Sequence, residues 1–117
     1  MYLQRSGSKY HNKSSIYNGS YYASQLEAAF AMELDLRFKA HDIKDWTKQI
    51  TVPLMVNGMK ICNYRVDFRV VNNDDSITWY ETKGLWTDVA RLKVKLFEAA
   101  YLSDRPNERF EIIKKGK

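Results

Sequence analysis

The first long stretch of regular patterning runs from Ser24 to about Ala40 and has the spacing of an amphipathic helix. Apolar residues recur there every three or four positions, as expected for a helix that buries one stripe. The stripe consists of Leu26, Ala29, Phe30, Leu34 and Phe38. Ser24 followed by Glu27 three positions later is a capping box, the pattern that opens many helices. The pattern therefore predicts a helix over 24–40 that packs this stripe inward.

After this helix the periodicity changes to that of β-strands separated by turn signals. Residues 46–52 are rich in strand-forming side chains and end at Pro53, which lacks the N–H needed inside a sheet. Two Asn-Gly dipeptides, at 18–19 and 57–58, lie between aromatic or apolar residues and predict hairpins over 15–22 and 54–61. Strands at 64–71 and 77–83, joined by the polar segment 72–76, form a third predicted pair.

A second amphipathic helix begins at Thr87 or Asp88, because either side chain can cap it. Its apolar stripe consists of Val89, Leu92, Leu96, Phe97, Ala100 and Tyr101. The polar break at 104–107 ends this helix, and 109–113 is the last predicted strand. The order of elements predicts an α/β fold with a mixed central sheet. We expect one domain over 14–117, preceded by a basic and flexible tail at 1–13.

Composition narrows the chemistry open to this domain. The chain has 117 residues with a net charge of +5, which favours an anionic partner such as nucleic acid. A single cysteine, Cys62, excludes an internal disulfide and a cysteine-rich zinc site, and two histidines leave little material for imidazole chemistry. There is neither an apolar run of about 18 residues nor a secretory signal, so we expect a cytoplasmic protein without a membrane partner.

Two carboxylates and a lysine are predicted to converge on the strand pair 64–71 and 77–83. If 72–76 is the turn, Val71 faces Ile77 and Asp67 falls opposite Glu81. Lys83 lies two positions beyond Glu81 and therefore shares its face of the sheet. Directly opposed carboxylates repel each other, and a divalent cation such as Mg²⁺ removes that penalty. The sequence thus predicts a cation site at Asp67 and Glu81, with Lys83 beside the reacting group.

Several of these residues also have structural interpretations. Glu81 and Lys83 alone are compatible with a solvated ion pair, which contributes less than about 1 kcal/mol. Glu27 is equally suited to cap the first helix. A tryptophan such as Trp86 commonly packs on a core. On the residues alone, these alternatives stay open.

Four motifs in order resemble the PD-(D/E)XK nuclease superfamily, and within it the phage endonuclease I family of Holliday-junction-resolving enzymes and small phage proteins of uncharacterised function. They are Glu27 on a helix, Asp67 near the end of a strand, Glu81-Thr82-Lys83 on the next strand, and Gly84-Leu85-Trp86 after it. Val66 stands where the signature has its proline. The resemblance implies a restriction-endonuclease-like core of a helix, three antiparallel strands, a helix and a strand.

The resemblance also implies roles for individual residues. Asp67, Glu81 and the backbone carbonyl of Thr82 would bind Mg²⁺ or Mn²⁺, Glu27 would bind metal directly or through water, and Lys83 would be the catalytic lysine. Gln49 would be an accessory polar residue on the first core strand. Side chains expected to contact DNA are Lys13, Trp86, Arg91, Lys93 and Lys95.

The function implied is a metal-dependent DNA endonuclease of phage type, acting inside the host cell on branched DNA such as a Holliday junction. Because a junction needs two symmetric cuts, we expect a homodimer, with the hairpin at 15–22 and the first helix as candidate contacts. The alternatives are a flap, single-strand or nicking nuclease, and a non-catalytic DNA-binding or adaptor protein on the same fold.

Overall fold

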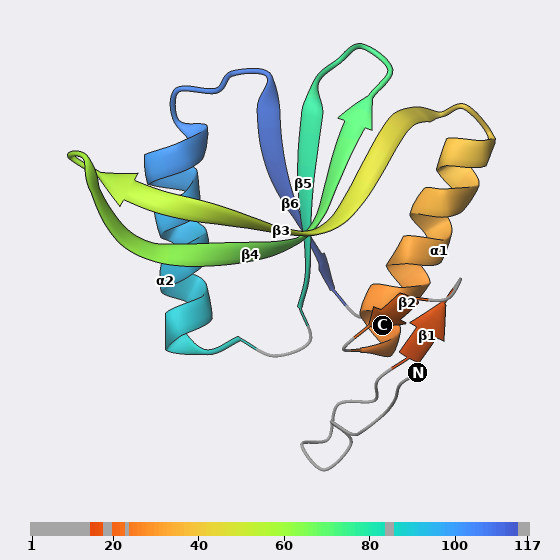
Figure 1. The fold of residues 1–117 in the computed structure, drawn as a ribbon, viewed down its shortest axis with the longest axis horizontal. Helices are drawn as coiled ribbons and strands as arrows, with labels where there is room; N and C mark the ends of the chain where they lie inside the picture. The colour runs from red at the N-terminus through yellow and green to blue at the C-terminus, as the bar shows by residue number, and fades with distance from the viewer. Residues whose placement is uncertain (1–14, 18–19, 23, 84–85, 115–117) are drawn as a thin grey trace.

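The computed structural model describes residues 15–17, 20–22, 24–83 and 86–114 (Figure 1). Its elements in chain order are β1 (Ser15–Tyr17), β2 (Ser20–Tyr22), α1 (Gln25–Lys39), β3 (Ile43–Val56), β4 (Met59–Asn72), β5 (Ile77–Lys83), α2 (Asp88–Leu96), the π-helix η2 (Phe97–Leu102) and β6 (Glu108–Lys114).

The central sheet has the strand order β3-β4-β5-β6. Its first three strands are antiparallel, whereas β6 runs parallel to β5. The prediction of an α/β fold with a mixed sheet is therefore confirmed, and helix, three antiparallel strands, helix and strand follow in the expected order. The restriction-endonuclease-like topology stays a prediction.

Strands β1 and β2 form a separate antiparallel hairpin, as predicted for 15–22. The turn of this hairpin, the predicted tail at 1–13 and Lys13 within it lie outside the described residues.

Helix α1 begins and ends where the sequence predicts, but its buried face only partly coincides with the predicted stripe. The Ser24 hydroxyl accepts the backbone N–H of Glu27 at 3.1 Å, and Ala40 is the C-terminal cap. The buried residues are Glu27, Ala28, Phe30, Ala31 and Leu34. Ala29 and Phe38 of the predicted stripe are exposed. Phe30 and Leu34 of the predicted stripe are confirmed, whereas Ala29 and Phe38 were wrong, because the buried face is turned toward Glu27, Ala28 and Ala31.

Strands β3 and β4 form one long hairpin, in which the predicted strand at 46–52 and the predicted hairpin at 54–61 are continuous with the strand at 64–71. Their ladder continues through Pro53, which pairs with Asn63, so the expected stop at Pro53 was wrong. Strand β3 is an edge of the described sheet, and proline is tolerated on an edge because one side of the strand needs no N–H donor. Asn57 and Gly58 form the predicted turn, with φ angles of 52° and 78°.

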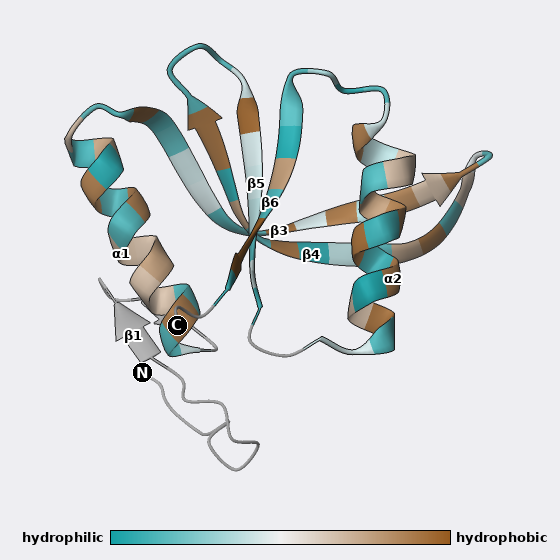
Figure 2. Cartoon of the chain, turned by 180° about the vertical axis from the view of Figure 1, so that it is seen from behind, coloured by the Kyte–Doolittle hydropathy of each residue, from teal (hydrophilic) through white to brown (hydrophobic). Residues whose placement is uncertain are grey.

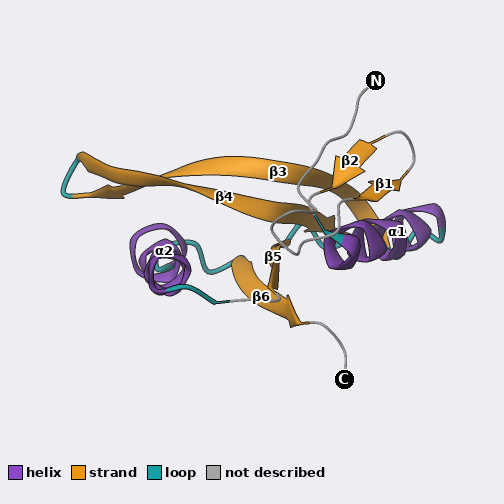
Figure 3. Ribbon diagram, turned by 90° about the horizontal axis from the view of Figure 1, so that it is seen from below, coloured by secondary structure: helices purple, strands orange, loops and turns teal. Residues whose placement is uncertain are grey.

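Two aromatic cores lie on opposite sides of β5. Figure 3 shows β5 and β6 between the two helices, beneath the β3–β4 hairpin. On the α1 side, Phe30 packs against Phe68 and Tyr80, with ring centroids 5.4 Å and 4.8 Å apart. On the α2 side, Phe97 packs against Tyr64 and Trp79, at 5.3 Å and 5.5 Å.

Helix α2 starts at the predicted cap, Thr87, whose hydroxyl accepts the N–H of Ala90 at 3.0 Å. Val89 and Leu92 of the predicted stripe are 62% and 64% exposed, so their inward packing was wrong. The helix instead buries Val94 and continues into η2, whose first residue, Phe97, is fully buried. Phe97 was part of the predicted stripe, and Leu96 and Tyr101 of that stripe are partly buried against the same core, so this half of the stripe is confirmed.

The far half of the β3–β4 hairpin carries apolar residues, drawn brown in Figure 2. Met55, Val56, Met59 and Ile61 are between 40% and 67% exposed. Within the described ranges, neither α1, α2 nor η2 has the length and apolar character needed to cross a bilayer.

Candidate active site

Strands β4 and β5 separate at the position of Asp67 and Glu81. Their ladder runs from Val71↔Ile77 to Phe68↔Tyr80 and ends there, although both strands continue. The predicted register is confirmed, because Asp67 and Glu81 are the next residues after the last pair. Instead of continuing the ladder, the two strands form a fork.

At this fork the two carboxylates replace the missing ladder hydrogen bonds. The backbone N–H of Asp67 donates to Glu81 Oε1 at 3.3 Å. In return, the backbone N–H and the hydroxyl of Thr82 donate to Asp67 Oδ2 at 2.8 Å and 2.6 Å. Each carboxylate is thus held by the other strand, and their charges are fixed close together. The sequence predicted this opposition but not the hydrogen bonds that hold it.

This arrangement disfavours the ionised form of Glu81. The residue is only 4% exposed, and burial, followed by the negative charge of Asp67, raises its pKa from 4.5 to about 7. The ammonium group of Lys83, which lies 3.2 Å from Glu81 Oε2, opposes that rise. A buried acid next to a second acid destabilises the fold at neutral pH, which is unusual unless a ligand compensates for it.

Lys83 and Arg91 both lie against the ring of Trp86. Lys83 Nζ is 5.8 Å and Arg91 Cζ is 5.7 Å from the ring centroid. Trp86 is half-buried and contacts the α2-side core, as its structural interpretation expected. Arg91 is exposed on the first turn of α2. Trp86 therefore links the acidic pair to a cationic helix face.

Glu27 and Gln49 approach the fork from two other elements. Glu27 is buried on the inner face of α1 at 5% exposure, and Gln49 Nε2 donates to its Oε2 at 3.4 Å. Gln49 lies between the ladder pairs Lys48↔Phe68 and Ile50↔Val66, and hence across from Asp67. Gln49 therefore lies beside Glu27 and across from Asp67, and its accessory role stays a prediction.

The backbone of Gln49 is strained at that position. Its φ angle is 56°, in the left-handed region that residues with a side chain avoid. The strained residue lies in the middle of a 14-residue strand. Strain of this kind is retained where function requires it, which makes Gln49 part of the candidate site.

The first testable prediction follows from this strain. Replacing Gln49→Gly should leave stability unchanged or raise it by up to about 1 kcal/mol, because glycine adopts positive φ without cost. Urea denaturation measures this difference. Thr51→Gly, on the same strand and exposed, is the matched control and should lose about 1 kcal/mol. If both variants lose stability equally, Gln49 is not strained.

Comparison with known proteins gives one family. The model of the family described as "Protein of unknown function (DUF1064)" matches residues 7–114. The chain belongs to the DUF1064 family. No curated protein and no solved structure matches the DUF1064 chain.

In this DUF1064 chain, the structure brings together most of the residues predicted to form the site. Asp67, Glu81, Thr82 and Lys83 are joined by hydrogen bonds or an ion pair. Trp86 and Arg91 lie beside them through the ring contacts of Lys83. Two further predicted DNA contacts lie along α2, the half-buried Lys93 and the exposed Lys95.

Two oxygen-bearing side chains at the fork fit a hard divalent cation, which prefers carboxylate ligands. The reciprocal hydrogen bonds hold the two carboxylates close together, and a cation between them would relieve the repulsion that contributes to the raised pKa of Glu81. Glu27 does not complete a set of three. In the described ranges, no group of three or more His, Cys, Asp and Glu side chains could hold a metal ion. The fit therefore rests on Asp67 and Glu81.

The sequence analysis did not single out Tyr64, whose hydroxyl is buried near the two carboxylates. Burial, then Glu81, then Asp67 raise its pKa far above the ordinary value. Tyr64 alternates with Val66, Phe68 and Val70 along β4, a pattern typical of core residues. No signal in the sequence distinguishes it from them.

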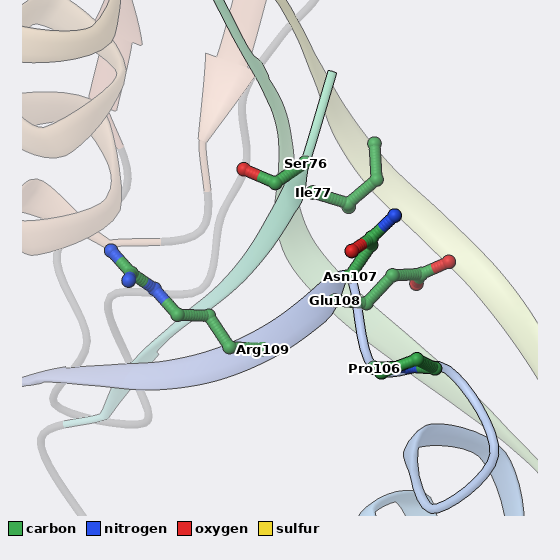
Figure 4. Close-up of a pocket in the computed structure, with 6 residues that line it drawn as sticks. All are labelled: Ser76, Ile77, Pro106, Asn107, Glu108 and Arg109. Atoms are coloured by element: carbon green, nitrogen blue, oxygen red, sulfur yellow. The ribbon is translucent and has the colours of Figure 1, made fainter. Parts of the chain in front are cut away.

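A pocket of about 170 Å³ lies at the opposite end of β5 from the acidic pair (Figure 4). Its charged residues already have structural partners. Glu108 accepts from Trp79 Nε1 at 2.7 Å, and Arg109 lies 3.1 Å from Glu111. Figure 4 shows the side chains of Glu108 and Arg109 extending away from each other. The fork between β4 and β5, and not this pocket, is therefore the candidate active site of this DUF1064 protein.

Proposed function

We propose that the protein is a Mg²⁺-dependent DNA endonuclease that hydrolyses phosphodiester bonds. The observation that carries this proposal is the reciprocal hydrogen bonding of Asp67 and Glu81 at the fork. Hydrophobic packing gives no reason to place the buried carboxylate of Glu81 beside the half-buried carboxylate of Asp67, because the pair costs stability. A bound divalent cation gives such a reason, and the excess of basic residues suits a polyanionic substrate.

The cation would be held by Asp67 and Glu81, with the carbonyl of Thr82 as the third predicted ligand. When bound, Mg²⁺ or Mn²⁺ would polarise the phosphodiester and lower the pKa of a water molecule that attacks it. Hydrolysis adds the water oxygen to phosphorus, breaks one P–O ester bond and delivers a proton to the leaving oxygen.

Lys83 has the position that this reaction needs for a cationic side chain. Its ammonium group pairs with Glu81 at 3.2 Å, yet its side chain keeps 23% of its surface exposed. The lysine can therefore stay close to the acidic pair while it donates to a non-bridging phosphate oxygen. Stabilisation of the extra negative charge on phosphorus by such a donor is a large contribution to catalysis.

Trp86 and Arg91 extend the site along the substrate. Arg91 would contact a backbone phosphate next to the cleaved one, and the half-buried Trp86 would offer part of its ring face to an unpaired base. Unpaired or splayed bases occur at branch points, which favours branched DNA as the substrate. Symmetric cleavage of a junction requires two sites, so we propose that the active form is a homodimer.

The direct test is cleavage of labelled DNA with EDTA, with Mg²⁺ and with Mn²⁺. The substrates are a four-way junction, a flap, a linear duplex and a single strand of shared sequence. The proposal predicts metal-dependent cleavage that is fastest on the junction. Faster cleavage of the flap or single strand would keep the nuclease and change its substrate. Binding without cleavage of any substrate would support the adaptor alternative and contradict the proposal.

A prediction for Arg91 tests the substrate contact separately from the chemistry. Arg91→Gln should weaken DNA binding in EDTA and reduce the slope of log K against log salt by about one, the value for one lost phosphate contact. Arg109→Gln is the matched control, because Arg109 is exposed and lies at the start of β6, away from the fork. Fluorescence anisotropy at several salt concentrations measures both slopes. Equal slopes for Arg91→Gln and the unaltered protein would remove Arg91 from the interface.

A further inference from the structure

Tyr64 is a buried tyrosine whose hydroxyl has no evident role in the packing of the core. The residue lies on β4 three positions before Asp67 and is only 5% exposed. Its ring contacts Phe97 edge-on at 5.3 Å, so the ring itself has a place in the α2-side core. Its hydroxyl oxygen is buried without a hydrogen bond of normal geometry to any side chain or backbone group in the described part of the chain. Phenylalanine would fill the same space without this defect.

Tyr64 and Glu81 lie on the same side of the sheet, because Trp79, two positions before Glu81 on β5, also packs on Phe97, at 5.5 Å. Apart from burial, the pKa of Tyr64 is raised by the charge of Glu81, then by that of Asp67, and then by a hydrogen-bonding approach to the Glu81 side chain. The two carboxylates of the fork are thus the main charged neighbours of this hydroxyl. A buried polar group without a partner needs an explanation, and a position next to the candidate site provides one.

The hydrogen bonds of Glu81 explain how the hydroxyl can be used. Glu81 Oε1 accepts from the backbone of Asp67, and Oε2 is paired with Lys83 at 3.2 Å. If Lys83 turns to a phosphate oxygen, Glu81 loses its cationic partner. An O–H donor beside Glu81 would then keep the carboxylate in one orientation. Tyr64 is such a donor, and it is already in place.

We propose that Tyr64 is a positioning residue whose hydroxyl donates to the Glu81 carboxylate when the fork holds its cation and Lys83 turns to the substrate. This inference rests on the proposed function, because it assigns to Tyr64 a role at the same site. Outer partners of this kind orient metal-binding carboxylates and commonly change metal affinity by one to two orders of magnitude.

The test is the affinity for Mn²⁺ alone, without DNA, measured by titration calorimetry on the whole chain. Tyr64→Phe should weaken Mn²⁺ binding about tenfold, the lower end of the effect of a lost outer partner. Tyr101→Phe is the matched control. Tyr101 stacks on Phe97 at 5.1 Å, on the same core, and its variant should bind Mn²⁺ as the unaltered protein does.

Thermal melting in EDTA provides the second measurement. Tyr64→Phe should melt at or above the temperature of the unaltered protein, because it removes a buried and unpaired hydroxyl. Equal Mn²⁺ affinity for Tyr64→Phe and the unaltered protein would overturn the inference and leave the proposed function intact. The same holds for a lower melting temperature with unchanged affinity, which would make the hydroxyl structural. Failure of the unaltered protein to bind Mn²⁺ would overturn both.

Discussion

Asp67→Asn should abolish DNA cleavage while DNA binding in EDTA persists. The amide keeps an oxygen that can accept the Thr82 donors, now at 2.8 Å and 2.6 Å from Asp67 Oδ2, so the fork should stay folded. The variant loses the negative charge that would hold the cation. Because loss of an outer-shell partner alone costs up to about a hundredfold in activity, loss of a ligand should cost more than that. Single-turnover cleavage of a labelled junction measures the effect.

Asp45→Asn is the matched control, because Asp45 is exposed on the neighbouring strand β3 and accepts only the N–H of Trp46, at 2.9 Å, among the hydrogen bonds seen. Its cleavage rate should equal that of the unaltered protein. An Asp67→Asn protein that still cuts at the normal rate would show that the site has been assigned to the wrong residues.

Glu81→Gln should stabilise the metal-free protein at alkaline pH. Between pH 4.5 and about 7, Glu81 of the unfolded chain has lost its proton, whereas Glu81 of the folded chain keeps it. The folded state then binds more protons than the unfolded state, so stability falls as pH rises through this window. The substitution removes that loss, which amounts to at most about 3 kcal/mol at pH 8.

Urea denaturation in EDTA at pH 4 and pH 8 tests this prediction. The unaltered protein should be less stable relative to Glu81→Gln at pH 8 than at pH 4. Glu98→Gln, an exposed site on η2, should change stability by no more than about 0.5 kcal/mol at either pH. A Glu81→Gln protein that is less stable than the parent at pH 8 would contradict the assigned cost of burying this acid.

The two predictions concern different properties of the fork: one substitution is expected to remove activity, and the other is expected to raise stability. A substitution that raises stability while it removes activity identifies a residue retained for function, because stability alone would select against it. A purely structural Asp67–Glu81 pair would lose stability and activity together.

Short-range signals in the sequence predicted most of the fold. Caps at Ser24 and Thr87 and the Asn57-Gly58 turn are decided by neighbouring residues, and all three are confirmed. The fork residues could be predicted because the 72–76 turn fixes the register of β4 and β5.

The failures share a different cause, since they depend on tertiary contacts. Pro53 is accepted inside β3 because that strand lies at the edge of the described sheet. Val89 and Leu92 are exposed because the buried part of this helical segment begins only at Val94. Burial and strand position at these sites depend on packing partners far away in the sequence, and the hydrophobic periodicity of a segment carries no information about those partners.

The candidate site likewise contains residues that the sequence predicts and features that only the structure shows. Asp67, Glu81 and Lys83 follow from strand register, whereas the positive φ of Gln49 and the buried hydroxyl of Tyr64 are seen only in the three-dimensional structure. The strand pattern predicts that Tyr64 is a core residue, and only the structure shows that Glu81 is a charged neighbour of its hydroxyl.

Anomalous diffraction from crystals soaked in Mn²⁺ tests the central claim most directly. The account predicts a peak between the carboxylates of Asp67 and Glu81, and its disappearance in crystals of Asp67→Asn. Crystals that diffract well but show no peak at the fork, with Glu81 still paired to Lys83, would contradict it.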